Sequence, residues 1–463
     1  MLYLDKHYLK LVLYKKLLEK IHNKNSNICI IGLGQVGLPT ALTFANIGYK
    51  VTGYDINESI IQSLSQKKSL FEEDGIKELL SRTIDNKTFA PSLSLNESVE
   101  GSDVIIVCVA TPTTEDVRPN LSFLQNALNS LSEFDLSEKL VIVESSIPPG
   151  TFENLIIPII TKNVLLGKNF WAAYVPERLS PSQAFSEIQK TPRIIGHEDS
   201  KSGVLAKSLY EKFVKSKILL TTSRSAELSK LVENTFRDVN IAFANEISLI
   251  CEKYNVDFGD LIRICNSHPR VNLHMAGPGV GGPCLPKDPY LLLNPANGDP
   301  IKSKIISESR KINDLMPLHV SNLTTKALEK QNKILSKSTI LILGTSYKGN
   351  VSDTRFSPSK DLIHDLLQKQ CRVLVYDPYT DESFNAEKLN TLDDSILSKC
   401  DAVVVISDHN EFKKIDPHFF QSMIEKPIIV DTKRIFNSSD IENLNMIYIS
   451  VGYLGLSFSK ENQ

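Results

Sequence analysis

The sequence predicts an α/β protein with two doubly wound parallel-sheet domains joined by a long central helix. Short apolar runs alternate with helical stretches in both the first and the last part of the chain, which is the pattern of a parallel sheet with helical crossovers. Between these parts, residues 223–268 contain no proline and a single glycine, Gly259. An uninterrupted stretch of this kind favours one long helix.

The chain of 463 residues is too long for a single hydrophobic core, so we expect it to divide. The expected parts are an N-terminal helical extension (residues 1–26), a first α/β domain (27–222), a central helical domain (223–330) and a second α/β domain (331–463).

The composition excludes several classes of protein. Hydrophobic residues make up 41% and charged residues 23% of the chain, as in soluble globular proteins. A net charge of -2 gives no reason to expect nucleic acid or an anionic membrane as partner. The seven cysteines are nowhere spaced as C-x-x-C, which favours reduced thiols in the cytoplasm and argues against disulfides or a metal site. No apolar run approaches the roughly 18 residues that a membrane span needs.

The extension has the pattern of an amphipathic helix. Leu9, Leu13, Leu17 and Ile21 recur at helical spacing, with lysines among them, and a signal peptide would need an uninterrupted apolar region. We expect a helix that packs on the rest of the chain; a helix for a membrane surface or a partner is the alternative.

A dinucleotide-binding motif opens the first α/β domain. The apolar run 27–31 leads directly into Gly32-Leu33-Gly34-Gln35-Val36-Gly37, followed by a helical pattern and a second apolar run, 51–54. In this context of strand, turn, helix and strand, the first glycine makes the turn and the second lets a pyrophosphate approach. The amides and partial positive charge at the helix start then bind the phosphates.

A carboxylate at the end of the second strand selects the cofactor. Asp55 follows Gly37 by 18 residues, where it can accept hydrogen bonds from ribose hydroxyls and repel a 2′-phosphate. The sequence therefore predicts binding of NAD rather than NADP.

Polar segments follow the later strands of this domain. The apolar runs 104–109, 140–144 and 172–175 end at Thr111-Pro112-Thr113, at 144–150 and at Pro176-Glu177-Arg178, respectively. Ligands bind at the carboxyl ends of strands in a doubly wound sheet, so these segments are candidate walls of the cofactor and substrate sites. Each could instead be an ordinary capping turn.

The central helix has apolar residues at helical spacing and one polar side. A helix of more than 25 residues is expected here, either linking two domains or packing against its copy in a second subunit. Lys230, Asn234 and Arg237 fall at i, i+4 and i+7, which places them on one side of the helix. They could meet a ligand, or they could form a solvated face.

A loop rich in glycine and proline precedes one cysteine. Residues 276–289 read A-G-P-G-V-G-G-P-C-L-P-K-D-P, with Cys284 followed by Lys287 and Asp288. Glycine allows backbone conformations closed to other residues, so main chain can approach a ligand and the thiol is held in one place. The alternative is a surface turn that carries a buried cysteine.

The last domain repeats the α/β pattern without the dinucleotide motif. Its strands are expected at 339–344, 372–376, 402–406 and 427–431. The first turn, G-T-S-Y-K-G, lacks G-x-G-x-x-G, so it is a poor dinucleotide site. Lys348 and Arg355 suit a second anionic ligand such as a nucleotide diphosphate, unless they are ordinary loop cations.

Taken in chain order, these motifs resemble the UDP-sugar dehydrogenases, the family of UDP-glucose, GDP-mannose and UDP-N-acetylhexosamine 6-dehydrogenases. The resemblance runs from about Asn27 to Gly455. Its motifs are G-L-G-Q-V-G-L-P, T-P-T, E-S-S-I-P-P-G-T, P-E-R, E-L-S-K-L-V-E-N-T-F-R-D-V-N-I-A-F-A-N-E, H-P-R-V-N, G-P-G-V-G-G-P-C-L-P-K-D and S-Y-K-G-N-V-S-D-T-R. The resemblance implies two Rossmann-like domains, the first binding NAD and the last binding the UDP-sugar. The long central helix favours a homodimer core, within a homodimer or a higher homo-oligomer.

The resemblance also implies a reaction. The sugar C6 alcohol is oxidised by four electrons to a carboxylate with two NAD in turn, and Cys284 forms a thiohemiacetal and then a thioester that water cleaves. H-P-R-V-N followed by G-P-G-V-G-G-x-C resembles the N-acetylhexosamine branch, which acts on UDP-N-acetyl-D-mannosamine or UDP-N-acetyl-D-glucosamine. L-P-K-D is shared with UDP-glucose enzymes, so a UDP-glucose 6-dehydrogenase that makes UDP-glucuronate is the alternative. The product would serve polysaccharide or protein glycosylation.

Roles for individual residues follow from the same resemblance. Lys230 and Asn234 would steady the oxyanion, Lys230 would take the alcohol proton, and Asp288 and Glu177 would handle the water. The residues implied for NAD are Gly32, Gly34, Gln35, Val36, Gly37, Asp55, Thr111 and Ser146. The residues implied for the UDP-sugar are Arg178, Leu179, Arg237, His268, Arg270, Gly281, Lys348 and Arg355.

Two other reaction classes are compatible with parts of the chain. A two-electron hydroxyacid dehydrogenase would need the lysine but not the cysteine, and a non-catalytic nucleotide sensor would need neither. The presence of Cys284, Lys230, Asn234 and Asp288 together favours the four-electron dehydrogenase.

Overall fold

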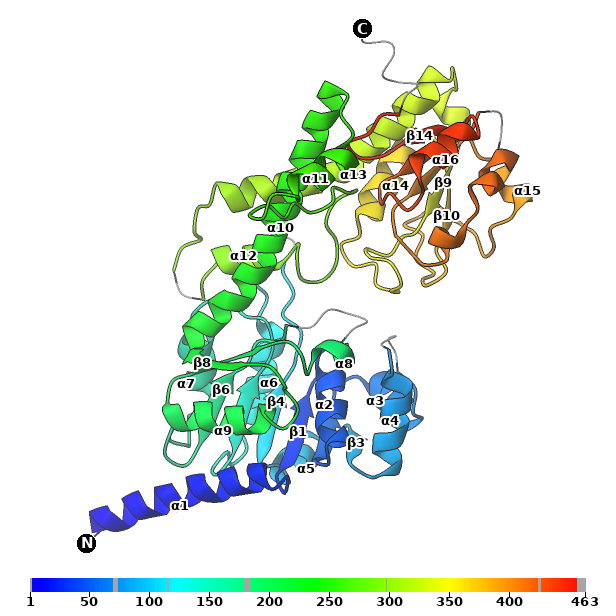
Figure 1. Cartoon of the computed structure of the whole chain (residues 1–463). Coiled ribbons are helices and arrows are strands. Elements are labelled where there is room, and N and C mark those ends of the chain that lie inside the picture. Colours follow the sequence, from blue (N-terminus) through cyan, green and yellow to red (C-terminus); the bar gives the residue numbers. More distant parts are fainter. Residues whose placement is uncertain are drawn as a thin grey trace. The chain divides into compact units, whose positions relative to one another are not determined.

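The computed structural model describes residues 2–69, 74–114, 116–178, 184–296, 298–423 and 426–455, with side chains from Leu11 onward (Figure 1). The chain forms two compact units. The first comprises Met1–Glu233 and Tyr290–Lys302, and the second comprises Asn234–Pro289 and Ser303–Gln463.

The first unit contains an eight-stranded sheet in the order β3-β2-β1-β4-β5-β6-β7-β8. Neighbouring strands are parallel except for the antiparallel pair β6 and β7. The strands are β1 Asn27–Ile31, β2 Lys50–Tyr54, β3 Phe89–Ser92, β4 Val104–Val107, β5 Leu140–Val143, β6 Trp171–Tyr174, β7 Arg193–His197 and β8 Ile218–Thr222. The strand order reverses beside β1, as it does in a doubly wound fold.

Helices cover both faces of this sheet. They are α1 Leu2–His22, α2 Gly37–Asn46, α3 Glu58–Ser65, α4 Ile76–Asp85, α5 Leu95–Glu100, α6 Ser122–Leu131, the π-helix η1 Phe152–Ile156, α7 Ile157–Ile160, α8 Ala184–Glu187 and α9 Ser200–Tyr210. One core cluster packs α2, α4 and α9 against one face, and a second packs α6 and α7 against the other. The central strands β4, β5 and β6 are buried along their whole length, which is why they read as continuous apolar runs.

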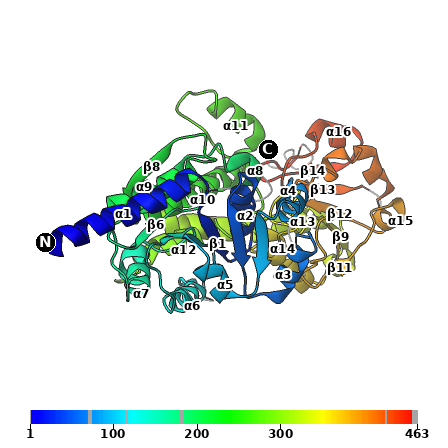
Figure 2. The ribbon, with the colours of Figure 1, turned by 90° about the horizontal axis from the view of Figure 1, so that it is seen from below.

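The N-terminal extension folds as α1, whose second half packs on α9 (Figure 2). Leu17 and Ile21 are buried in the core of the first unit. The Tyr49 hydroxyl donates to the Ile21 carbonyl at 2.7 Å, and Lys20 forms an ion pair of 2.6 Å with Asp103. These contacts make the second half of the helix part of the first unit.

The predicted central helix is confirmed as α10, Ser223–Tyr254, which has 32 residues and passes from the first unit into the second. Its residues up to Glu233 belong to the first unit, and those from Asn234 onward belong to the second.

The second unit contains a six-stranded parallel sheet in the order β11-β10-β9-β12-β13-β14. Its strands are β9 Thr339–Leu343, β10 Arg372–Tyr376, β11 Glu387–Lys388, β12 Ala402–Val405, β13 Ile428–Asp431 and β14 Ile447–Ile449. The helices from α11 onward are α11 Phe258–Cys265, α12 Asp288–Leu293, α13 Ile305–Lys330, α14 Pro358–Gln368, α15 Asp394–Leu397 and α16 Ser438–Asn443, with 3-10 turns η2 Leu335–Lys337, η3 Phe412–Lys414 and η4 Pro417–Ser422. The predicted fold class, two parallel-sheet domains with a long helix between them, is confirmed.

None of the helices in the described part of the chain is both long enough and apolar enough to cross a membrane.

Candidate active site

Two glycines of the first unit's nucleotide loop are required by packing. Gly32 has a φ of +92°, and a Cβ there would lie 2.9 Å from the Cys108 carbonyl oxygen. A Cβ at Gly37 would lie 1.8 Å from the Gly32 carbonyl oxygen. The start of α2 therefore packs directly on the turn after β1, which only glycine allows.

Gly34 differs because the space around it is open. A Cβ at Gly34 would meet no atom of the described residues within 4 Å. Val36, the residue before α2, makes no side-chain hydrogen bond to the first turn of the helix. Open space over a glycine at an uncapped helix start fits the pyrophosphate of a dinucleotide.

Asp55 is held at the end of β2, beside this loop. Its Oδ2 accepts a hydrogen bond from the Leu33 amide at 2.8 Å, and its Oδ1 accepts one from the Asn57 amide at 2.9 Å. These bonds fix the carboxylate next to the glycine turn, where it can also accept from ribose hydroxyls. The loop and Asp55 together fit NAD.

Two further predicted cofactor residues meet at the carboxyl ends of β4 and β5. The Thr111 hydroxyl donates to the Ser146 carbonyl at 2.6 Å, and the Ser145 hydroxyl donates to the Val109 carbonyl at 2.7 Å. The loops after the two strands are thereby tied together.

The cysteine loop of the second unit begins on a buried polar network. The Gly277 amide donates to Asn245 Oδ1 of α10 at 2.9 Å, and Asn245 Nδ2 donates to Asn313 Oδ1 of α13 at 2.9 Å. Asn313 Nδ2 in turn donates to Asp238 Oδ1 at 2.9 Å, and Arg310 Nη1 donates to the same oxygen at 2.6 Å. All four side chains are buried, so the network fixes the start of the loop against two long helices.

Further along, the loop packs on Tyr347, in the segment after β9. A Cβ at Gly281 or at Gly282 would lie 2.7 Å from Tyr347 side-chain atoms. The Gly282 amide donates to the Arg355 carbonyl at 2.9 Å. Burial, with smaller contributions from the charges of Asp353 and Cys284, raises the pKa of Tyr347 to about 12. The Tyr347 side chain is therefore uncharged at neutral pH where it packs on the glycines before Cys284.

Cys284 stands at the start of a turn that presents a carboxylate. The Asp288 amide donates to the Cys284 carbonyl at 2.8 Å, and the Asp288 side chain is 1% exposed. Asn234 Nδ2 of α10 donates to Asp288 Oδ2 at 2.6 Å, and Lys287 Nζ lies 3.3 Å from Asp288 Oδ1. The structure thus groups a half-buried thiol with a buried carboxylate, an amide and a cation, which are the parts of nucleophilic and acid–base catalysis.

Three sections of the chain match domains of one family. Residues 26–214 match the NAD binding domain, residues 224–315 the central domain and residues 341–438 the UDP binding domain of the UDP-glucose/GDP-mannose dehydrogenase family. The chain belongs to this family. It is an NAD-dependent nucleotide-sugar dehydrogenase, as predicted.

Individual members are similar over most of their length. A UDP-N-acetyl-D-mannosamine dehydrogenase of Methanococcus vannielii is 40% identical over 421 residues, which are 89% of this chain and 94% of the relative. The solved structure of a UDP-D-ManNAc dehydrogenase of Pyrococcus horikoshii has a TM-score of 0.85 at 38% identity and covers 92% of this chain and 99% of its own. A UDP-glucose dehydrogenase structure of Pyrobaculum islandicum has a TM-score of 0.79 at 25% identity, covering 92% and 98%.

The remaining predicted site residues are divided between the first and the second unit. In the first unit, Lys230 and Glu177 are buried, and Arg178 donates to both oxygens of Glu233 at 2.8 and 2.6 Å. Leu179 lies outside the described residues. The exposed side chains Arg237 and Arg355 belong to the second unit, where the charges of both act on Tyr347.

His268 and Arg270 lie in the turn that follows α11. Both are exposed there, and the Arg270 amide donates to His268 Nδ1 at 3.3 Å. Lys348 is half-buried in the turn after β9.

The second sheet of the dehydrogenase lacks the features that let Asp55 meet a ribose. The corresponding carboxylate, Asp377 at the end of β10, is 5% exposed. Its Oδ2 accepts from the amides of Thr345 and Ser346 at 2.8 and 3.0 Å and from His409 Nε2 at 3.2 Å. Because Asp377 already accepts these hydrogen bonds, it agrees with the prediction that the turn after β9 does not bind a dinucleotide.

One half-buried cation was missed by the sequence analysis. Lys433 follows β13 at the carboxyl edge of the second sheet, and its Nζ lies 3.9 Å from where a Gly277 Cβ would stand. Burial lowers its pKa, against the charges of Asp408 and Asp431. A positive charge at this edge suits an anionic ligand, and the D-T-K-R sequence directly after a buried strand was the signal that could have revealed it.

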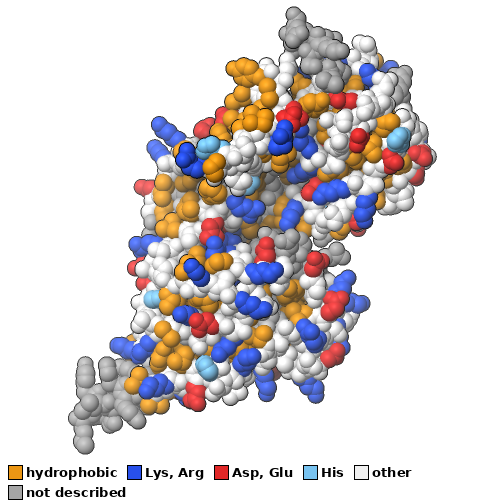
Figure 3. Space-filling view, in the orientation of Figure 1, with side chains coloured by type: hydrophobic (Ala, Val, Ile, Leu, Met, Phe, Trp, Pro, Cys, Tyr) orange, Lys and Arg blue, Asp and Glu red, His pale blue; other side chains and the backbone are white. Residues whose placement is uncertain are grey.

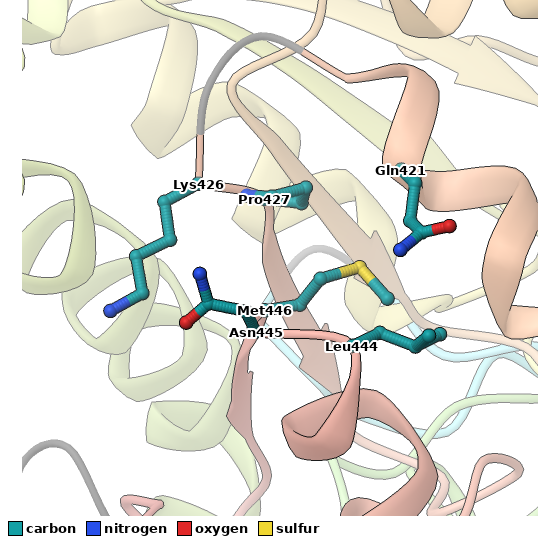
Figure 4. Close-up of a pocket in the computed structure, with 6 residues that line it drawn as sticks. All are labelled: Gln421, Lys426, Pro427, Leu444, Asn445 and Met446. Atoms are coloured by element: carbon teal, nitrogen blue, oxygen red, sulfur yellow. The ribbon is translucent and has the colours of Figure 1, made fainter.

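A cavity of about 310 Å³ lies at the opposite edge of the second sheet, where β13 and β14 begin (Figure 4). It is lined by Gln421, Lys426, Pro427, Leu444, Asn445 and Met446. These side chains include no thiol, carboxylate or imidazole, in contrast to the group formed by Cys284, Asp288 and Asn234. Within the described residues, no group of three His, Cys, Asp or Glu side chains could hold a metal ion.

The two classes of glycine in the nucleotide loop predict different mutant behaviour. We expect Gly34→Ala to fold with an unchanged Tm but to bind NAD at least about tenfold more weakly, because its methyl group occupies the open space over the loop. Gly37→Ala is the matched control, and its Tm should fall because the new Cβ overlaps the Gly32 carbonyl. Calorimetric titration with NAD and thermal unfolding measure both; a Gly34→Ala variant with parental affinity would contradict this account.

The bond between α10 and Asp288 predicts a catalytic defect. Asn234→Ala removes the amide that donates to Asp288, and we expect kcat to fall about 100-fold, as when an electrostatic donor is removed from an active site. Asn240→Ala is the control on the same helix, since its side chain donates to the Phe236 carbonyl at 2.7 Å. Initial rates of NADH formation test the pair, and equal rates for the two variants would exclude the role given to Asn234.

Proposed function

We propose that the dehydrogenase oxidises the C6 hydroxyl of UDP-N-acetyl-D-mannosamine to a carboxylate by four electrons, through a thioester on Cys284. The observation that carries this proposal is the grouping of Cys284, Asp288 and Asn234 in the second unit. A two-electron alcohol dehydrogenase needs no thiol, whereas oxidation past the aldehyde needs a nucleophile that makes the aldehyde carbon a hydride donor again.

The choice of sugar rests on the relatives and on one motif. Relatives named UDP-N-acetyl-D-mannosamine dehydrogenase are 37–40% identical over most of the chain. Residues 268–272, H-P-R-V-N, precede the cysteine loop as in the N-acetylhexosamine branch. UDP-glucose is the second candidate, supported by L-P-K-D at 285–288 and by the similarity to the Pyrobaculum islandicum enzyme.

The first half of the reaction takes the alcohol to a thioester. Lys230 accepts the C6 hydroxyl proton as the aldehyde forms, and the Cys284 thiolate then adds to the aldehyde carbon to give a thiohemiacetal. Bound NAD supplies the hydride acceptor for both oxidation steps. The Asn234 amide and the Lys230 ammonium stabilise the oxygen while it carries negative charge.

The second half is hydrolysis. Asp288 and Glu177 are the bases proposed for the water, which gives up a proton and adds to the thioester carbon; the carbon–sulfur bond breaks, and Cys284 leaves as a thiolate. In sum, one alcohol, two NAD⁺ and one water give one carboxylate, two NADH and three protons. The product is a UDP-N-acetylhexosaminuronate, a donor for polysaccharide or other glycan synthesis.

We also propose that the enzyme is a homodimer formed through α10. Phe236, Phe243 and Ile250 of the second unit recur every seven residues on one side of the helix and are 63%, 48% and 45% exposed. Hydrophobic side chains also gather on the surface over α11 and the adjoining end of α10 (Figure 3). A repeating apolar stripe of this kind suits the same stripe of a second copy.

The number of NADH molecules formed per UDP-sugar consumed tests both the four-electron reaction and the choice of substrate. With limiting UDP-N-acetyl-D-mannosamine and excess NAD, we expect two NADH per sugar, and fewer with UDP-N-acetyl-D-glucosamine or UDP-glucose. Cys284→Ala should form no acid, whereas Cys265→Ala, which changes another half-buried thiol of the second unit, should behave as the parent.

Other results would revise the proposal in separate ways. Two NADH with UDP-glucose alone would keep the reaction and overturn the choice of sugar. One NADH per sugar, or undiminished acid formation by Cys284→Ala, would overturn the thioester reaction.

The dimer is tested by mass in solution. We expect sedimentation equilibrium to give the mass of two chains for the parent and of one chain for Phe236→Glu/Phe243→Glu, because charges on the stripe prevent its burial. Leu165→Glu, at a 57% exposed leucine of the first unit, is the control and should remain dimeric. A monomeric parent would refute this assembly.

A further inference from the structure

The turn after β9 lies where the strand order of the second sheet reverses. β9 has β10 on one side and β12 on the other, and the three strands are parallel. Their carboxyl ends therefore meet at one edge, and open α/β sheets bind ligands at such a point of reversal. The turn, residues 344–350, carries Tyr347 and Lys348 and lies in the section that matches the UDP binding domain.

The segment after β12, residues 407–410, holds this turn through hydrogen bonds. They run from the Ser407 hydroxyl to the Ser346 carbonyl (2.5 Å), from the Gly349 amide to Asp408 Oδ1 (3.1 Å), from the Asn350 amide to His409 Nδ1 (2.9 Å) and from the Asn410 amide to Asn350 Oδ1 (2.9 Å). A Cβ at Gly349 would lie 2.5 Å from the Asp408 carbonyl oxygen, so the two segments are in direct contact. The residues that follow β12 therefore help to set the position of the turn.

His409 also bonds to the residue that follows β10. A backbone amide can only donate a hydrogen bond, so Nδ1, which accepts from Asn350, carries no proton. In the neutral ring the proton is then on Nε2, which donates to Asp377 Oδ2 at 3.2 Å. The ring is fully buried and stacks on Tyr379, with 4.7 Å between the ring centres and 13° between the planes. His409 is therefore fixed in one tautomer and one orientation.

Asp377 and His409 hold opposite ends of the turn. Asp377 Oδ2 accepts from the amides of Thr345 and Ser346 near the start of the turn, whereas His409 accepts from the amide of Asn350, its last residue. Burial acts to raise the pKa of Asp377, but the hydrogen bonds from His409 and from these two amides bring it below its usual value. Asp377 is therefore ionised at neutral pH, and the residues between the two ends are supported from both sides.

The last residue of the turn has a backbone conformation that needs support. Asn350 has a φ of +60°, in the left-handed region that residues other than glycine seldom adopt, although asparagine tolerates it better than most. His409 accepts from its amide, and the Asn410 amide donates to its side chain, so both bonds favour this conformation. Loss of the first bond leaves an amide unpaired beside a buried position, which favours displacement of the turn.

We propose that His409 is a positioning residue for the UDP-sugar site: by accepting from the Asn350 amide, it holds the turn that presents Lys348 to the diphosphate of the substrate. This inference rests on the proposed function, in which a UDP-sugar is the substrate, and on the predicted contact of Lys348 with it. Tyr347, the residue before Lys348, packs on the glycines that precede Cys284. The same turn therefore also supports the loop that carries the nucleophile.

The test compares two substitutions that keep different hydrogen bonds of His409. His409→Asn places an amide oxygen near the position of Nδ1, where it can accept from Asn350, whereas His409→Gln places its amide near the position of Nε2, where it can donate to Asp377. We expect the affinity for UDP, measured by calorimetric titration, to fall at least about tenfold in His409→Gln and less than about threefold in His409→Asn. The KM for UDP-N-acetyl-D-mannosamine should change in parallel.

The comparison separates positioning from stability. Both variants lose the stacked ring, so a merely structural role would weaken UDP binding by similar factors in the two, or in neither. Thermal unfolding shows whether each variant folds. If His409→Gln does not fold, His409→Leu, which fills the buried space without an acceptor, takes its place in the comparison. Equal affinities for UDP in the two folded variants would overturn the proposal.

Two controls make the outcome specific. His319→Gln changes another histidine of the second unit, whose Nε2 lies 2.9 Å from Glu252 Oε1, and should leave the affinity for UDP unchanged. The affinity for NAD should be parental in every variant, because the glycine loop that follows β1 belongs to the first unit. An equal loss of NAD affinity in His409→Gln would contradict a role confined to the UDP-sugar site.

Failure of the underlying function has a different signature. Lys348→Ala removes the predicted contact with the diphosphate, and if this variant binds UDP as tightly as the parent, the UDP-sugar site assigned to the turn is wrong. If Lys348→Ala weakens UDP binding at least about tenfold but the two His409 variants bind UDP equally, the site stands and the inference about His409 is wrong.

Discussion

The position of the loop that carries Cys284 depends on one hydrogen bond, from the Gly277 amide to the buried side chain of Asn245. The loop has little regular secondary structure of its own, and its glycines allow many backbone conformations. Asn245 is in turn fixed by Asn313, and Asn313 by Asp238, so two long helices determine where the loop begins. The network stabilises this arrangement because leaving its buried side-chain amides unpaired would be costly.

The same helix positions the chemical groups farther along the loop. Asn234, Asp238 and Asn245 lie on the buried side of α10, and the first of them donates to Asp288, four residues after the cysteine. One rigid element therefore sets both the start of the loop and its catalytic end. Rigid support of this type keeps a nucleophile such as Cys284 and a base such as Asp288 at a fixed distance and orientation.

Local sequence patterns were sufficient for much of the fold. The strands β1 and β10 begin and end where predicted, and α10 begins at the predicted Ser223, because unbroken apolar runs and the absence of proline are local signals. The edge strands were not predicted. β3 contains Pro91, which reads as a strand breaker, and β8 is half exposed with two threonines, so neither resembles a buried run.

The candidate site was only partly predictable for a related reason. The glycine motif and the cysteine loop are contiguous and could be recognised directly, whereas the bond between Asn234 and Asp288 joins residues 54 positions apart. Arg193, a buried arginine at the start of β7, and Lys433, a half-buried lysine after β13, were missed because a single charged residue beside an apolar run resembles a capping residue. Their burial depends on strand order and register, which no local pattern contains.

The most direct test of the central claim is to trap the covalent intermediate. Asp288→Asn, which slows the hydrolytic step, would be mixed with UDP-N-acetyl-D-mannosamine and NAD, quenched and digested, and the Cys284 peptide weighed. The account predicts a peptide heavier by the UDP-uronyl group, with the added mass released by hydroxylamine as expected of a thioester. NADH release accompanied by an unmodified Cys284 peptide at every quench time would contradict it.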